Sequence, residues 1–144
     1  MGNQMDAVSR NRQRMKEFER MINTADTALA DRLIDANAPF YTPISKEPLH
    51  GGSGYLAVVQ LMRQGFSDVQ WKMEDMAAEA DKVAVRWQCT GTHDGEFMGL
   101  APTGKKFSAC VMNFYYFNED GKITNDIAAE GMIAILRALG LCQY

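Results

Sequence analysis

Two carboxylates near the end of the sequence are spaced so that both could transfer protons. A strand is predicted for residues 123–129, and its alternation places Thr124, Asp126, Ala128 and Glu130 on one face. Where such a face lines an apolar cavity, desolvation raises the pKa of a carboxyl group, which suits proton abstraction beside a carbonyl. We therefore predict Glu130 as the first candidate base and Asp126 as the second. The alternative is that either one caps or pairs at a solvated rim.

The elements that must position these carboxylates change character along the chain. Apolar residues three, four and seven apart predict a helix from about Asp6 to Ile22, a short helix after Asp26 and a third opened by Gly51. Alternating residues then predict strands, at about 68–79, 82–92, 107–117 and 123–129, with a closing helix after residue 131. Helices followed by a run of strands indicate an α+β fold. We predict a single domain over residues 1–144.

Composition excludes several classes of function. The chain has 144 residues, 47% hydrophobic and 23% charged, with a net charge of -3, so no basic surface for nucleic acid is expected. No apolar run reaches the ~18 residues of a membrane span, and the first residues are polar, so neither a membrane partner nor export is expected. Three scattered cysteines favour reduced thiols and a cytoplasmic location. The spacing of His and Cys predicts no metal site, and no cofactor motif is present.

Three features in order carry a family resemblance. They are the N-terminal helices, the segment Gly-Thr-His-Asp-Gly-Glu-Phe-Met-Gly-Leu-Ala-Pro-Thr-Gly at residues 91–104, and Asp-Gly-Lys-Ile at 120–123 followed by a helix ending Leu-Gly at 139–140. Together they resemble the SnoaL-like polyketide cyclases of the nuclear transport factor 2-like superfamily. The resemblance implies a cone, in which a strongly curved, mostly antiparallel sheet wraps around the helices and encloses an apolar pocket. It also implies a homodimer formed through the outer face of the sheet.

The resemblance also places the family's catalytic positions on this chain. The family's acid/base Asp corresponds to Ala128, and its His corresponds to Asn113. Alanine cannot transfer a proton, and an asparagine amide forms hydrogen bonds but does not titrate. His93 belongs to the family segment, and it would either orient a substrate carbonyl or hydrogen-bond the backbone of its turn. His50 precedes the third helix near the expected mouth of the cone, where a surface or capping role is the alternative.

Aromatic residues are the candidates for the pocket wall. Because alternate residues of a strand share a face, Asn113 and Tyr115 are placed inside together. Trp87, on the face of two neighbouring valines, either lines the pocket or packs in the core. Tyr41 and Tyr55 are further candidates for binding substrate.

The sequence thus predicts a cofactor-independent cyclase or isomerase acting by acid–base catalysis on a small hydrophobic carbonyl compound. The alternative is a non-catalytic protein that binds a hydrophobic metabolite, because both catalytic positions of the family are replaced. A third hypothesis is a dimeric scaffold whose pocket has collapsed.

Overall fold

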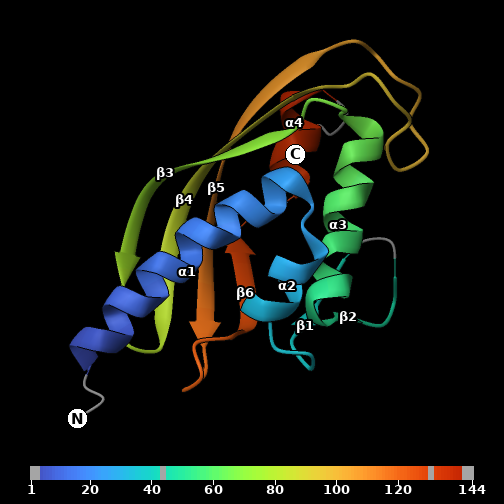
Figure 1. The fold of residues 1–144 in the computed structure, drawn as a ribbon. Coiled ribbons are helices and arrows are strands. Elements are labelled where there is room, and N and C mark those ends of the chain that lie inside the picture. Colours follow the sequence, from blue (N-terminus) through green and yellow to red (C-terminus); the bar gives the residue numbers. More distant parts are fainter. Residues whose placement is uncertain (1–3, 43–44, 130–131, 141–144) are drawn as a thin grey trace.

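The computed structural model describes residues 4–42, 45–129 and 132–140; among these, the first three helices precede the main sheet and the last helix follows it (Figure 1). The elements follow in the order α1 (Gln4–Thr24), α2 (Thr27–Leu33), β1 (Pro39–Phe40), β2 (Leu49–His50), α3 (Gly51–Gly65), β3 (Gln70–Ala78), β4 (Lys82–Thr92), β5 (Lys106–Phe117), β6 (Ile123–Ala129) and α4 (Met132–Ala138). This order confirms the predicted α+β class. None of the described helices is long and apolar enough to cross a membrane.

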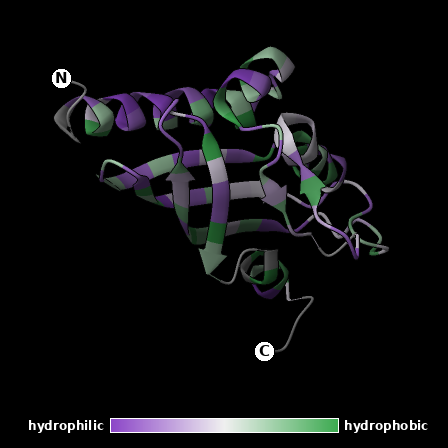
Figure 2. Ribbon diagram, turned by 90° about the horizontal axis from the view of Figure 1, so that it is seen from below, coloured by the Kyte–Doolittle hydropathy of each residue, from purple (hydrophilic) through white to green (hydrophobic). Residues whose placement is uncertain are grey.

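The helices form where their apolar stripes can be buried. In α1 the residues Met15, Phe18 and Met21 are fully buried, whereas charged residues cover the opposite face, which is largely purple in Figure 2. Helix α2 begins at Asp26, whose carboxylate accepts a hydrogen bond from the backbone N–H of Leu29 at 3.0 Å. These two helices and α3 supply the apolar face that packs against the sheet.

Strands β3, β4, β5 and β6 form one antiparallel sheet in sequence order, with β3 and β6 at its edges. The inward residues of β4 are buried and alternate with more exposed ones. A small second sheet pairs β1 with β2 at the start of α3. After α2 the backbone contacts β6, because the N–H of Asp35 donates to the carbonyl of Ile123 at 2.9 Å.

Helix α1 covers the edge strand β3 with hydrogen bonds as well as apolar contacts. The amide of Asn23 donates to the carbonyl of Trp71 at 2.8 Å and accepts from the N–H of the same residue at 2.9 Å. One turn earlier, Glu19 accepts a hydrogen bond from the N–H of Met73 at 2.5 Å. These side chains satisfy backbone groups that a neighbouring strand would otherwise pair, so the first part of this edge is not free to add another strand.

A β-bulge in β6 decides which residues of that strand face the helices. Phe117 pairs with Ile123 but Tyr116 pairs with Asn125, so Thr124 is an extra residue with no partner opposite it. Such an insertion reverses the alternation of faces beyond it. Ile123 is therefore buried before the bulge, while Asp126 faces the same side after it.

Candidate active site

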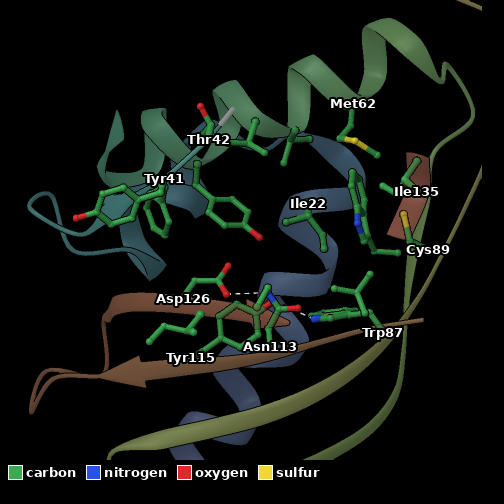
Figure 3. A pocket seen from close by; sticks show the side chains of 18 of the residues that line it. Ile22, Tyr41, Thr42, Met62, Trp87, Cys89, Asn113, Tyr115, Asp126 and Ile135 are labelled. Carbon is green, nitrogen blue, oxygen red and sulfur yellow. Dashed lines mark hydrogen bonds between the residues drawn. The ribbon is translucent and has the colours of Figure 1, made fainter. Parts of the chain in front are cut away.

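A cavity of about 670 Å³ lies between the inner face of the sheet and the helices (Figure 3). This size falls within the range of small-molecule sites. Most of its wall is apolar, and its polar side chains include Asn113 from β5, Asp126 from β6 and Tyr55 from α3. The residues from the predicted set that line it are Tyr41, Tyr55, Trp87, Asn113, Tyr115 and Asp126.

Asp126 is the acidic residue in the described wall of this cavity. In the β5–β6 ladder Asn113 lies opposite Ala128 and Tyr115 lies opposite Asp126. The Asn113 amide Nδ2 donates to Asp126 Oδ1 at 2.7 Å, as Figure 3 shows. Tyr55, from α3, lines the same cavity. The neighbouring strand β5 thus holds the carboxyl group through Asn113.

Burial sets the proton affinity of this carboxyl group. Desolvation raises the pKa of Asp126 from 3.8 to about 6, and the hydrogen bonds from Asn113 and Tyr55 offset part of that rise because they favour the charged form. A carboxyl group with this pKa is mostly ionised at neutral pH and is a much stronger base than an exposed aspartate. It can therefore accept a proton and return it at the pH of the cell.

Two tyrosines and a tryptophan continue from Asp126 into the core. Trp87 Nε1 donates to the hydroxyl of Tyr115 at 2.9 Å. Burial, followed by the negative charge of Asp126, raises the pKa of both tyrosines well above the ordinary value of 10.0. Both phenols therefore remain protonated at neutral pH.

The opposite end of the cavity is apolar and chemically inert. Met62, Cys89 and Ile135 lie at this end, away from Asp126 (Figure 3). Burial raises the pKa of the Cys89 thiol to about 12, so it is not a thiolate nucleophile at physiological pH. The cavity thus offers one polar end that can react and one apolar end that can hold a hydrophobic group.

The remaining candidates lie elsewhere. Tyr41 is at the cavity mouth and 79% exposed, whereas His50 is an exposed residue just before α3 and is not part of the cavity wall. His93 is fully buried outside the cavity, beside Phe66, and its Nδ1 is 3.0 Å from the Thr103 hydroxyl. The ring's hydrogen bond thus goes to a side-chain hydroxyl and not to the backbone of the turn, and the catalytic role of His93 stays a prediction. Glu130 lies outside the described residues.

Sequence reasoning did not name several wall residues. Val58, Val59 and Met62 share with Tyr55 the inward stripe of α3, a stripe that the helical spacing does predict. Phe40 and Ile22 enter the wall from β1 and α1, and only the tertiary arrangement brings them there. Among the described residues, no cluster of three or more His, Cys, Asp or Glu side chains could hold a metal ion.

The fold and this polar-ended cavity define a class of protein, and comparison with known proteins identifies it. The family model of the SnoaL-like polyketide cyclases matches residues 12–139, so the chain belongs to that family. Aklanonic acid methyl ester cyclase AcmA from Streptomyces galilaeus is 33% identical over 109 residues, which are 72% of this chain and 74% of the relative.

Solved structures agree with the fold. TsrD from Streptomyces laurentii superimposes with a TM-score of 0.79 at 19% identity, covering 93% of this chain and 97% of its own. IdmH from Streptomyces antibioticus gives a TM-score of 0.73 at 25% identity, with 90% and 98% of the two chains covered. These likenesses establish the fold, and the family model and the curated relative establish the predicted family.

Proposed function

We propose that this protein closes a ring in a small, hydrophobic, polyketide-like carbonyl compound, with Asp126 as the general acid–base. The observation that carries the proposal is the Asp126 carboxylate on the wall of an apolar cavity, fixed by Asn113 and with its pKa raised by burial. Membership of a polyketide cyclase family and the likeness to a relative named as the cyclase of aklanonic acid methyl ester support the same reaction class.

The proposed reaction is an intramolecular aldol addition that needs only proton transfer. The Asp126 carboxylate removes a proton from the carbon beside a substrate carbonyl, and the C–H electron pair forms the enolate. The enolate carbon attacks a second carbonyl of the same molecule, forming the C–C bond while that carbonyl becomes an alkoxide. The protonated Asp126 then returns its proton to the alkoxide, so the carboxylate is regenerated and no other reactant is consumed.

Asn113 is suited to steady the charge that develops on the enolate oxygen. One hydrogen of its Nδ2 is used on Asp126, and the second remains for a substrate oxygen in the same cavity. A donor already held in place stabilises such an oxyanion without reorganising during the reaction. The apolar end at Met62 and Ile135 would bind the part of the substrate that does not react.

The position of the Asp126 carboxylate supports proton transfer in this protein even though both catalytic positions of the family are replaced. Those positions, Asn113 and Ala128, lie directly opposite each other in the β5–β6 ladder. Asp126 is two residues away from Ala128 on the same strand, which is about 7 Å along it, and its side chain reaches back to Asn113. We infer that Asp126 takes over the role that Ala128 cannot perform.

Turnover by substituted proteins tests this assignment. Aklanonic acid methyl ester, the compound in the relative's name, is the first substrate to assay, followed by smaller diketones. Asp126→Asn is expected to lower kcat by about 10³-fold, the usual contribution of a general acid–base. Asp120→Asn, at an exposed turn, is the matched control and is expected to retain full activity. Full activity of Asp126→Asn with loss in Glu130→Gln would transfer the role to Glu130.

The second candidate function is binding without catalysis, and the observation that favours it is the loss of both titratable family positions to Asn113 and Ala128. Native mass spectrometry of the purified protein with candidate ligands distinguishes the two. A compound that both the unchanged protein and Asp126→Asn hold without altering it supports the binding function. A compound that only the unchanged protein converts supports the enzyme.

A further inference from the structure

The backbone of β6 forms part of the cavity wall. Four consecutive residues of this strand line the cavity: Asn125, Asp126, Ile127 and Ala128. Successive side chains of a strand point to opposite faces, so a cavity on one face alone would be lined by every second residue. A continuous run means that the cavity extends to the edge of the strand. Because β6 is an edge strand of the sheet, its edge-facing backbone groups border the cavity.

Hydrogen bonds at both ends of β5 show which way its backbone groups point. At one end the N–H of His93 donates to the carbonyl of Lys105 at 2.8 Å, and at the other the N–H of Phe117 donates to the carbonyl of Asp81 at 2.9 Å. The pairing of β4 with β5 is regular between these two bonds. Since the residues of a central antiparallel strand bond alternately to its two neighbours, the odd-numbered residues of β5 bond to β4 and the even-numbered ones to β6.

Two residues of β6 therefore have backbone groups on the free edge of the sheet. Ala128 lies opposite Asn113 and Asp126 lies opposite Tyr115, so the N–H and C=O of both point away from β5. The Asp126 N–H agrees with this direction, because it donates to Oδ1 of Asn125 at 2.9 Å. Ala128 is exposed, and its N–H has no hydrogen-bond partner among the described residues. A backbone donor is thus available at the cavity wall.

We propose that the backbone N–H of Ala128 is a catalytic hydrogen-bond donor, which binds the oxygen of the substrate carbonyl that the enolate attacks. This inference rests on the proposed aldol addition with Asp126 as the base. As the new C–C bond forms, the π electrons of the attacked carbonyl move onto its oxygen, which becomes an alkoxide. Asn113 is assigned to the enolate oxygen, so this second oxygen needs a donor of its own.

The position of the Ala128 N–H suits that role. Asn113 and Ala128 form a pair without mutual backbone hydrogen bonds, in which the two Cα atoms are about 4.5 Å apart. Two donors at neighbouring positions can serve two oxygens of one molecule. Tyr41 and Thr42 lie on the other side of the cavity from Asp126 (Figure 3), so a substrate held between them would shield the donor from water. A fixed backbone donor stabilises a developing negative charge most strongly in such a water-excluded place.

Amide hydrogen exchange of Ala128, followed by NMR, tests the inference without any assay of turnover. The probes are benzoylacetone, a small hydrophobic 1,3-diketone, and aklanonic acid methyl ester bound to Asp126→Asn. In the free protein the Ala128 N–H is expected to exchange faster than that of Ile127, which bonds to β5. At about 90% occupancy by a probe its exchange is expected to slow about tenfold, since mainly the unbound tenth exchanges. The exchange of Ile127 is the internal control and is expected to change little.

A proline substitution tests the same donor by its effect on turnover. Ala128→Pro removes the N–H, and an edge strand accepts proline where the missing N–H would lie on its free side. It is expected to lower kcat by about 10²-fold, the usual effect of losing one donor to a developing oxyanion. Ala78→Pro is the matched control. Ala78 lies opposite Val83, an inward residue that bonds to β5, so its N–H is turned out at the other edge of the sheet, and it is not in the described cavity wall. Full activity is expected for this control.

Several results would overturn the inference. They are an Ala128 N–H already protected in the free protein, an exchange rate that a bound probe leaves unchanged, failure of both probes to bind at millimolar concentration, and full activity of Ala128→Pro. Where Ala128→Pro does not fold, the exchange measurement decides alone. If Asp126→Asn is inactive while Ala128→Pro is fully active, the proposed function stands and this inference fails. If a probe protects the Ala128 N–H while Asp126→Asn keeps full activity, the donor stands and the proposed function fails.

Discussion

Replacing Asp126 with asparagine is expected to make the folded protein more stable at neutral pH. The pKa of Asp126 is raised from 3.8 to about 6 in the folded state. The folded protein therefore binds this proton more tightly than the unfolded chain, and the free energy of unfolding falls as the pH rises between the two values. A difference of about 2 pH units corresponds to about 3 kcal/mol, an upper value because part of the side chain is open to the cavity.

Measuring the effect of the substitution at two pH values isolates the free-energy cost of burying the charged Asp126 carboxylate. The change in unfolding free energy caused by Asp126→Asn is measured with urea at about pH 4.5 and about pH 7.5. It is expected to be about 2 kcal/mol more stabilising at the higher pH, because roughly a third of the full cost is already present at the lower one. Any constant cost of placing an amide beside Asn113 cancels in this comparison.

Asp120→Asn provides the control, since that residue is exposed in the turn before β6. Its effect on the free energy of unfolding is expected to be the same at both pH values. An effect of Asp126→Asn that does not change with pH, or that becomes less favourable as the pH rises, would refute the reasoning. It would mean that the carboxylate is well solvated in the folded protein, and the argument that burial makes it a strong base would fail with it.

Two further predictions concern other parts of the molecule. On the outer face of the sheet the exposed fractions of Met112, Phe114 and Ile127 are 58%, 48% and 54%, and we propose this face as the interface of a homodimer. Phe114→Lys is expected to give monomers in analytical ultracentrifugation. A monomeric unchanged protein would contradict the proposed interface. Cys110 is exposed and Cys89 is buried with its pKa raised to about 12, so a thiol reagent is expected to label Cys110 first. Labelling of Cys89 in the folded protein at a comparable rate would contradict that burial.

Periodicity was sufficient to predict the helices and the four long strands of this fold, but not the short strands β1 and β2. The strand predicted at residues 82–92 coincides with β4, because its apolar residues alternate strictly and the structure buries them on one face. The start of α3 at Gly51 was also predictable from the glycine itself. Its φ in the structure is 71°, a value that glycine adopts without strain. Local signals of this kind require no knowledge of which elements meet.

The site was harder to predict because it depends on register. Simple alternation places Asp126 opposite in face to Ile123, yet both point inward, and the bulge at Thr124 is what reconciles them. No local sequence pattern predicts that bulge. The meeting of Tyr55 and Asp126 in one cavity likewise depends on the tertiary arrangement, so it could not be predicted from spacing alone.

The choice between the two carboxylates shows the same limit. Alternation gives Glu130 and Asp126 equal standing, and the preference for Glu130 rested on the sequence alone. For Asp126 the structure supplies a cavity, a hydrogen bond from Asn113 and a raised pKa. These are tertiary properties, which is why Asp126 becomes the leading candidate only once the fold is known.

The measurement that tests the central claim most directly is the pH dependence of kcat/KM for the unchanged protein and Asp126→Asn on the same substrate. For the unchanged protein the value is expected to fall about tenfold per pH unit below about pH 6 and to level off above it, following the pKa of Asp126. In Asp126→Asn this acid limb is expected to disappear and the remaining rate to be about 10³-fold lower. An acid limb that persists in the variant, with the rate unchanged, would show that another group transfers the proton.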